Sequence, residues 1–349
     1  MASLIGGIKK IALLPLHAGA VGTASKSFKK NSVLGSPRLN RMGLHVKRVT
    51  LAEKMSMRRQ AGLARLISCE QAELINRDGY IVIKNVLPED VFEKLSNEVE
   101  NTEFLAREMR QGGTVTRLIP LPPAKLASLE YLNDFVNGDL FQGILRYTAS
   151  FNHESLVNLH TVITDPSRGD TDPQTMFHSD TFHATAKGWF FLRDVEMADG
   201  PFGYVPGSHR MTKGRLDWEY EQSLIAAKHG NGHHAGGSFR ASSSDIKAMG
   251  YGEIEPLPVP ANSLVIADTH GFHARCESTR PSTRLSIYGS LRCNPFVPVS
   301  SLDVFALPGL RGRKGDVVYM GRAALAKLAK QGEPQPIVGM VRPGDPAVL

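Results

Sequence analysis

The chain has 349 residues, of which 42% are hydrophobic, and this is enough apolar material for one large packed core. No run of eighteen uncharged apolar residues occurs, so no membrane-spanning helix is predicted. The net charge of +7 arises at the start of the chain: nine Lys and Arg precede the first acidic residue, Glu53, and the other 32 basic residues are matched by 34 acidic ones. A slightly acidic body argues against nucleic-acid binding, which requires a basic face on the fold itself.

Residues 1–55 are predicted to form a basic, poorly structured N-terminal arm. Three interpretations of residues 1–50 stay open: a solvated arm that packs partly on the body, an organellar transit peptide, or an arm that touches anionic membrane. A secretory signal is disfavoured because Pro15 and His17 interrupt the apolar run.

The three cysteines show no CxxC pair, which argues against a disulfide framework and against a four-cysteine zinc site. Such sparse thiols are typical of a reducing compartment. We therefore expect a cytoplasmic protein, with peripheral membrane contact or an organellar destination as the alternatives.

The first predicted elements follow the arm. Ser68, with acidic and amide residues after it, predicts a helix through Ile75. A turn at Asp78-Gly79 then leads into a β-branched strand over 80–86, and Pro88 starts a second helix. Residues 102–150 are predicted to be helical, with a break at "IPLPPAK".

Beyond residue 155 the pattern changes to strands separated by Gly, Pro, Asp and Ser. The predicted strands cover 156–165, 187–195, 262–268 and 284–292. Helices followed by many strands favour an α+β, mainly β fold with an antiparallel core and supporting N-terminal helices. We expect the main domain to cover 56–300 and a C-terminal extension with one short helix to cover 301–349.

Residues 228–253 are small, polar and Gly-rich, and they predict a long mobile loop or lid. The histidines of "HGNGHH" within it could trap a metal, but a solvated lid is the favoured interpretation.

The chemistry-bearing stretch is "FHSDTFH". In a strand, residues i and i+2 point to the same face, so His178 and Asp180 would converge at short range. A third ligand is available from "LVIADTHGFHAR", which offers both His270 and His273. Two histidines and one carboxylate on one face of iron leave positions open for a co-substrate and oxygen.

Four pieces of the sequence together resemble the phytanoyl-CoA dioxygenase family of Fe(II)- and 2-oxoglutarate-dependent oxygenases. They are "NRDGYIVIKNVL", "FHSD", "ADGPFGYVPGSHR" and "GFHARCESTRPSTR", which span roughly residues 76–295 in the order of the family. The resemblance implies a double-stranded β-helix, that is, a cupin-like jelly roll. It leaves residues 1–60 and 300–349 uncovered.

The resemblance also chooses between the distal histidines. The family's ligand is followed about eleven residues later by an arginine that holds the far carboxylate of 2-oxoglutarate. That interval leads from His273 to Arg284, whereas the matching interval from His270 ends on Pro281. The implied metal ligands, which are also the catalytic residues, are His178, Asp180 and His273, with Arg284 for the co-substrate and Arg280 as the fallback.

The activity implied is a dioxygenase that uses Fe(II), 2-oxoglutarate and O2. It would hydroxylate an unactivated C–H bond of a small-molecule or lipid-linked substrate and release succinate and CO2. The carboxylate of Asp180 favours hydroxylation over halogenation. The alternatives are a non-catalytic jelly-roll binding protein, and a hydrolase or isomerase that uses the same three residues with another metal.

Other polar residues near this stretch have weaker assignments. Lys187 could neutralise the co-substrate or the substrate, or extend to solvent, and we expect it among the cofactor-binding residues. His183 lies at an odd offset from Asp180, and His209 lies in a turn, so both are expected not to bind metal. Arg240 is a weak candidate for substrate contact.

Overall fold

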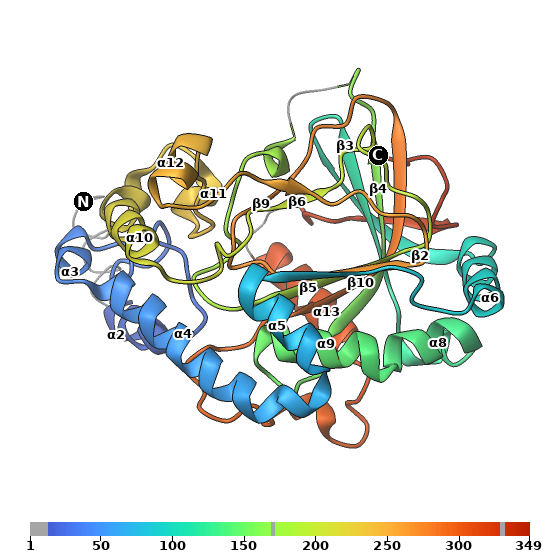
Figure 1. The fold of residues 1–349 in the computed structure, drawn as a ribbon, viewed down its shortest axis with the longest axis horizontal. Coiled ribbons are helices and arrows are strands. Elements are labelled where there is room, and N and C mark those ends of the chain that lie inside the picture. Colours follow the sequence, from blue (N-terminus) through green and yellow to red (C-terminus); the bar gives the residue numbers. More distant parts are fainter. Residues whose placement is uncertain (1–12, 169–171, 329–331) are drawn as a thin grey trace.

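The structure, a computed structural model, describes residues 13–168, 172–328 and 332–349. Two antiparallel sheets form its centre, and helices cover one face and one side of them (Figure 1). The prediction of a mainly β core with supporting helices is confirmed. No helix in the described residues has both the length and the hydropathy needed to cross a bilayer.

The strands, in chain order, are β1 (Tyr80–Ile83), β2 (Phe104–Gln111), β3 (Thr114–Pro120), β4 (Leu156–Thr164), β5 (Ala186–Phe191), β6 (Phe202–Tyr204), β7 (Glu255–Pro256), β8 (Ser263–Asp268), β9 (His273–Arg275), β10 (Ser282–Leu291) and β11 (Ile337–Val341). The larger sheet has the order β1-β8-β5-β10-β4-β3-β2-β11, and the smaller has the order β7-β6-β9.

The helices are α2 (Leu14–Gly19), α3 (Pro37–Arg41), α4 (Leu44–Leu63), α5 (Cys69–Asp78), α6 (Glu89–Glu100), α7 (Pro123–Leu126), α8 (Glu130–Asn137), α9 (Asp139–Ala149), α10 (Lys213–Ile225), α11 (Gly232–Ala235), α12 (Ser243–Ala248) and α13 (Lys314–Leu328). Single 3₁₀ turns lie at Ala20–Gly22, Ala64–Leu66, Pro173–Thr175, Ala226–Lys228 and Val304–Ala306.

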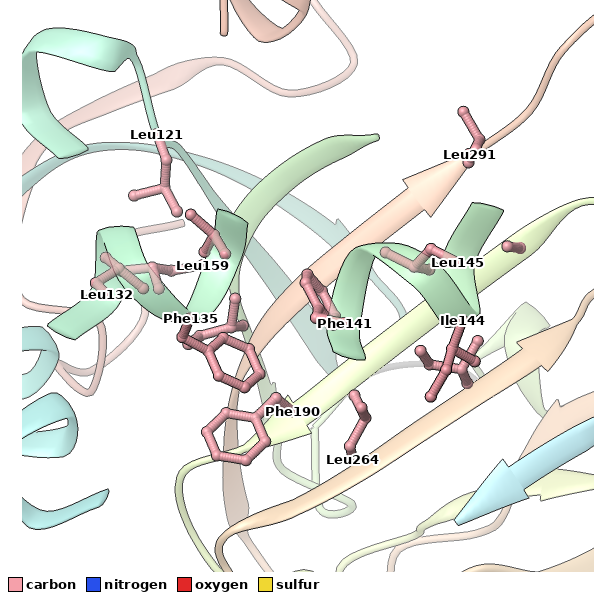
Figure 2. Close-up of a cluster of buried hydrophobic side chains, with 14 of the residues drawn as sticks. Leu121, Leu132, Phe135, Phe141, Ile144, Leu145, Leu159, Phe190, Leu264 and Leu291 are labelled. Carbon is pink, nitrogen blue, oxygen red and sulfur yellow. The ribbon is translucent and has the colours of Figure 1, made fainter. Parts of the chain in front are cut away.

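The main hydrophobic core lies between the larger sheet and helices α8 and α9 (Figure 2). Phe135 of α8 stacks on Phe190 of β5 with ring centroids 4.2 Å apart. Helix α9 approaches the sheet closely at Gly289, where a Cβ atom would come within 2.7 Å of Leu145 and Phe141. The paired strands β5 and β10 therefore present small or apolar residues to the helices.

The opposite face of the same two strands carries polar and aromatic side chains. Successive strand residues point to opposite faces. Because Phe190 faces the helices, Lys187 and Trp189 of β5 face the other way, as do Arg284 and Tyr288 of β10. This alternation builds the floor of the cavity described below.

Several predicted elements are confirmed, but the region 102–150 differs from its prediction. The capping box of Ser68 and Gln71 starts α5, and the four strands predicted beyond residue 155 correspond to β4, β5, β8 and β10. The region 102–150, predicted as helical with a break at "IPLPPAK", begins instead with the hairpin of β2 and β3. Composition misled here, because β2 is rich in helix formers and places Glu108 at a buried position.

Two segments predicted as loosely structured are better ordered than expected. The stretch 228–253 contains α11 and α12, and the second of these starts with a capping box of Ser242 and Asp245. In the C-terminal extension, β11 adds to the larger sheet beside β2, with a bulge between Ile337 and Gly339. The sequence pattern had indicated only the helix in this region.

The N-terminal segment also differs from expectation. Residues 13–55 do not form a poorly structured arm, because α4 runs across the expected boundary at residue 55 and packs on the body. The Arg48 guanidinium is buried and donates hydrogen bonds to the carbonyls of Val21, Thr23 and Ser25. Residues 1–12 lie outside the described part of the chain.

Candidate metal centre

The backbone around His178 is held from two sides. His178 pairs with His273, the first residue of β9, through two backbone hydrogen bonds of 3.0 Å, and it faces Arg240 on its other side. The Asp180 amide donates to the carbonyl of Thr269 at 2.9 Å. These isolated bridges, and not a long strand, fix the "HSD" segment next to β9.

This pairing brings the three predicted ligands together. One ligand atom from each of His178, Asp180 and His273 lies within 4.8 Å of the other two. His178 Nε2 is 3.9 Å from Asp180 Oδ1, and His273 Nε2 is 3.8 Å from Asp180 Oδ2. Two imidazoles and one carboxylate at such separations surround a space that fits a divalent metal ion.

The tautomers of both histidines suit metal binding. Nδ1 of His178 lies 2.8 Å from the Met176 carbonyl, and Nδ1 of His273 lies 2.9 Å from the Gly271 carbonyl. A carbonyl oxygen only accepts, so each Nδ1 carries the proton and each Nε2 presents a lone pair to the shared space. Burial lowers the pKa of His178 well below its usual value and that of His273 to about 4, which keeps both rings neutral.

Asp180 is ionised despite its burial. Desolvation opposes its charge, but the ammonium group of Lys187 outweighs this effect and holds the pKa of Asp180 well below the usual range. Lys187 Nζ lies 2.6 Å from Asp180 Oδ2. The lysine therefore turns toward the carboxylate and not toward bulk solvent, and its side chain is 28% exposed.

A cavity of about 260 Å³ adjoins two of the three residues, His178 and His273. His178, His273, Lys187, Trp189 and Arg284 contribute to its wall. Histidines, a lysine and an arginine around an apolar and aromatic enclosure make a site suited to a small anion.

Arg284 is buried in this wall. One of its Nη atoms donates to the Gly200 carbonyl, and its Nε has no hydrogen-bond partner among the described residues. Burial, and next the charge of Arg275, lowers the pKa of Arg284 to about 9. Arg280, the fallback, lies outside the cavity wall and pairs with Asp199 and Glu196 near the surface.

The remaining histidines lie elsewhere. His270 lines a second cavity with His209, and neither belongs to the group of three ligands. His183 is buried, with Nδ1 3.0 Å from the Ala184 carbonyl, and it too stands outside this group. His234 of the expected solvated lid is in fact buried and stacks on His229 at a centroid distance of 4.0 Å.

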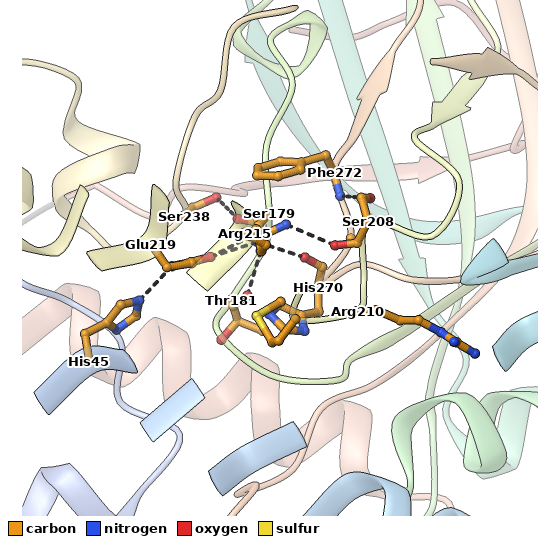
Figure 3. A network of polar contacts seen from close by, with 12 residues as sticks. His45, Ser179, Thr181, Ser208, Arg210, Arg215, Glu219, Ser238, His270 and Phe272 are labelled. Carbon is orange, nitrogen blue, oxygen red and sulfur yellow. Dashed lines mark hydrogen bonds and ion pairs between the residues drawn. The ribbon is translucent and has the colours of Figure 1, made fainter. Parts of the chain in front are cut away.

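A buried polar network connects α10 with the loop that precedes β9 (Figure 3). Arg215 of α10 bonds to Glu219 and to the Ser208 carbonyl, and Glu219 bonds to His45 of α4 at 2.7 Å. The Ser208 hydroxyl accepts a hydrogen bond of 2.7 Å from the backbone amide of Phe272, the residue before His273. The network thus supports the loop that leads into the distal histidine.

Lys26 is a site residue that the sequence did not indicate. Its Nζ donates to the backbone carbonyl of Asp180, across 154 residues of chain. No motif marks such a contact, since it depends on how the N-terminal segment packs on the body.

A family model described as "Phytanoyl-CoA dioxygenase (PhyH)" matches residues 75–274, which is more than half of the chain. The chain belongs to the phytanoyl-CoA dioxygenase family. The matched part contains His178, Asp180 and His273 and stops before Arg284.

Among curated proteins, the chain is 22% identical over 165 residues to the human peroxisomal phytanoyl-CoA dioxygenase. The match covers 42% of this chain, and the chain spans about half (48%) of the length of that relative.

Among solved structures, one similar chain is the epimerase SnoN from nogalamycin biosynthesis, with 18% identity, a TM-score of 0.39, and coverage of 66% of this chain and 82% of that one. HygX from Streptomyces hygroscopicus, solved with nickel, 2-oxoglutarate and hygromycin B, has 14% identity, a TM-score of 0.39, and coverage of 70% and 95%. EctD from S. alaskensis, solved with 2-oxoglutarate and 5-hydroxyectoine, has 14% identity, a TM-score of 0.40, and coverage of 64% and 76%.

Proposed function

We propose that the protein is a non-haem Fe(II)- and 2-oxoglutarate-dependent dioxygenase that hydroxylates an unactivated C–H bond of a small molecule and releases succinate and CO2. The observation that carries this proposal is the cavity that His178, His273 and Arg284 line together. It is bordered by two neutral histidines that direct Nε2 toward one carboxylate, and by the buried Arg284. Family membership supports the same assignment.

In this proposal His178, Asp180 and His273 hold the metal ion. When bound, Fe(II) supplies the redox chemistry that couples decarboxylation of 2-oxoglutarate to C–H oxidation. The backbone carbonyls of Met176 and Gly271 orient the two imidazoles, so the site is arranged before the metal arrives.

Arg284 would bind the far carboxylate of 2-oxoglutarate, because a guanidinium can donate two parallel hydrogen bonds to a carboxylate. Its Nε is buried without a partner among the described residues, so a ligand oxygen would satisfy it. Lys187 compensates the charge of Asp180 beside the metal position. Trp189 and Phe202, with ring centroids 4.7 Å apart, line the cavity and exclude water.

The test uses the full chain without oxygen. Adding Fe(II) and 2-oxoglutarate is expected to give a visible charge-transfer band, and admitting air is expected to release succinate. Asp180→Ala should lose both signals, whereas Asp217→Ala, which removes an exposed carboxylate on α10, should keep them. Absence of both signals in the unaltered protein would favour a non-catalytic jelly roll. Turnover without oxygen would favour a hydrolase or isomerase.

Contact of residues 1–50 with anionic membrane is a further part of the proposal. The described part of this segment leaves five cationic side chains exposed, namely Lys29, Lys30, Arg38, Arg41 and Lys47. Surface cations attract anionic lipid, and this attraction weakens in salt. Co-sedimentation with phosphatidylserine vesicles that is lost at high salt would support the contact, and no co-sedimentation at low salt would refute it. The reducing, cytoplasmic location stays a prediction.

A further inference from the structure

Four cationic side chains gather around Asp180. They come from distant parts of the sequence: Lys26, Lys187, Arg240 and Arg292. The family match covers Lys187 and Arg240 but not the other two. The cluster is therefore partly a property of this chain, built from its N-terminal segment and the end of β10.

Arg240 is placed by the backbone next to a metal ligand. It faces His178 as an antiparallel partner, and the amides on either side, Ala241 and Ser179, make the flanking hydrogen bonds of 3.0 Å. The facing residues are thus a non-hydrogen-bonded pair, the arrangement in which two side chains on one face come closest. Arg240 consequently projects on the same face as His178, on the side away from His273.

The Arg240 guanidinium is buried without enough partners. Arg240 is 8% exposed, and its Nε atom has no hydrogen-bond partner among the described residues. One Nη atom donates to Ser238 Oγ at 3.0 Å. A buried charge with unsatisfied donors is costly unless an anion completes it.

The other two cations, Lys26 and Arg292, come from the N-terminal segment and from the residue after β10. Lys26 donates to the Asp180 carbonyl, and Arg292 donates to the Ala24 carbonyl at 3.1 Å. The Lys29 amide donates to the Ala235 carbonyl at 3.0 Å, which ties the same N-terminal segment to the loop before Arg240. Arg292 is exposed and therefore lies at the outer edge of the cluster.

The cluster lacks compensating carboxylates. In the described residues, Lys187 pairs with Asp180, and Lys26, Arg240 and Arg292 have no carboxylate oxygen within 4.0 Å. Of the four cations, three therefore lack a carboxylate partner among the described residues.

We propose that Lys26, Arg240 and Arg292 bind an anionic group of the substrate, a carboxylate or a phosphate, beside the metal position. This assignment rests on the proposed function and adds the substrate class to it. It is separate from the co-substrate site, because Arg284 lines the cavity on the β9 and β10 side, whereas Arg240 lies across His178 from β9.

The experiment titrates two probes, inorganic phosphate and malonate, into protein saturated with Fe(II) and 2-oxoglutarate without oxygen, so that Arg284 is already occupied. Calorimetry is expected to show saturable binding of at least one probe. Arg240→Gln and Lys26→Gln should each weaken it by about tenfold or more, and Arg240→Lys should restore part of the loss. Arg58→Gln, which removes an exposed arginine on α4, is the matched control and should change nothing.

The outcomes separate the two levels of the proposal. A charge-transfer band that survives in Arg240→Gln shows that the variant is folded and that the metal and co-substrate sites are intact. Binding of malonate alone assigns a carboxylate, and binding of phosphate alone assigns a phosphate. If neither probe binds, or if Arg240→Gln binds both as well as the unaltered protein, the anion site is refuted. If the band itself never forms, the proposed function fails, and titration of the metal-free protein still decides the anion site.

Discussion

Arg215 and Glu219 lie one turn apart in α10 and form an ion pair that solvent does not reach. Arg215 Nη2 and Glu219 Oε1 are 2.8 Å apart, and the two side chains are 0% and 2% exposed. The guanidinium also lies 3.8 Å above the ring of Phe272. The pair thus joins a helix to the loop that precedes the distal histidine.

Removing the arginine should destabilise the fold strongly. Arg215→Met leaves the Glu219 carboxylate buried without its main partner, which typically costs about 3–5 kcal/mol. Urea unfolding monitored by circular dichroism would measure the loss. Lys213→Met is the matched control, because Lys213 pairs with Asp217 at the same spacing on the same helix but is 90% exposed, and it should cost less than about 1 kcal/mol. Equal losses in the two variants would contradict this account.

The same pair predicts a dependence of stability on acid. Burial opposes ionisation of Glu219, but Arg215 and then His45 outweigh it, and its pKa falls from 4.5 to about 2. A carboxyl whose pKa is depressed by folding stabilises the protein above its unfolded pKa, and this stability is lost as pH falls through the folded value.

The free energy of unfolding should therefore drop between about pH 4.5 and pH 2, and the gap between the unaltered protein and Glu219→Gln should shrink over this window. Urea titrations at pH 6, 4.5 and 3.5 would test this. A gap that stays constant with pH would show that the Glu219 charge does not contribute.

Arg284 and Arg280 offer a direct comparison of the two candidates for the far carboxylate of 2-oxoglutarate. Arg284→Met should weaken 2-oxoglutarate binding by about 10- to 150-fold, the range expected for losing hydrogen bonds to a charged group. Anaerobic titration of the charge-transfer band would measure it, with Fe(II) affinity followed separately. Arg280→Met should leave the affinity unchanged, because Arg280 is engaged with Asp199 outside the cavity. The reverse result would transfer the role to Arg280.

His273 and His270 can be separated in the same way. His273→Gln should lose most of the affinity for Fe(II) or a substitute such as Ni(II), because His273 Nε2 lies 3.8 Å from Asp180, whereas His270 stands outside the group of three ligands. His270→Gln should retain metal binding and lower stability instead, since His270 is buried beside a different cavity. Calorimetric titration with Ni(II) would measure the first effect and thermal melting the second. Full metal binding by His273→Gln would overturn the assignment.

The strands that carry the site could be predicted from sequence, and the hairpin of β2 and β3 could not. The segment "RLSIYGSLR" of β10 is rich in β-branched and aromatic residues, so its local preference and its structure agree. Strand β2 places Glu108 at a buried position, where Arg117 of β3 compensates its charge. Glu108 therefore interrupts the alternation of apolar and polar residues in β2, which is the pattern that would have predicted a strand.

In the candidate site, too, some residues could be predicted from sequence and others could not. His178 and Asp180 follow from a short local spacing, whereas choosing His273 over His270 needed the family resemblance, because both follow the same strand. The contact of Lys26 with Asp180 had no sequence signal, since a basic residue in a Gly- and Ser-rich segment resembles any solvated lysine. Its role depends on α4 and the preceding turns packing on the body.

The pairing of β11 with β2 has a consequence for how the protein behaves at high concentration. One of the two borders of the larger sheet is this five-residue strand, β11, which is interrupted by a bulge where Gly339 has a φ of +103°. Behind it, the buried Arg117 donates to the carbonyls of Arg342, Pro343, Asp345 and Pro346 and so holds the chain after β11 in place. A short, kinked border offers a poor template for strand addition by another molecule, whereas the eight-residue β2 that it covers would be a good one. The C-terminal segment thus acts as a guard against aggregation through the sheet edge.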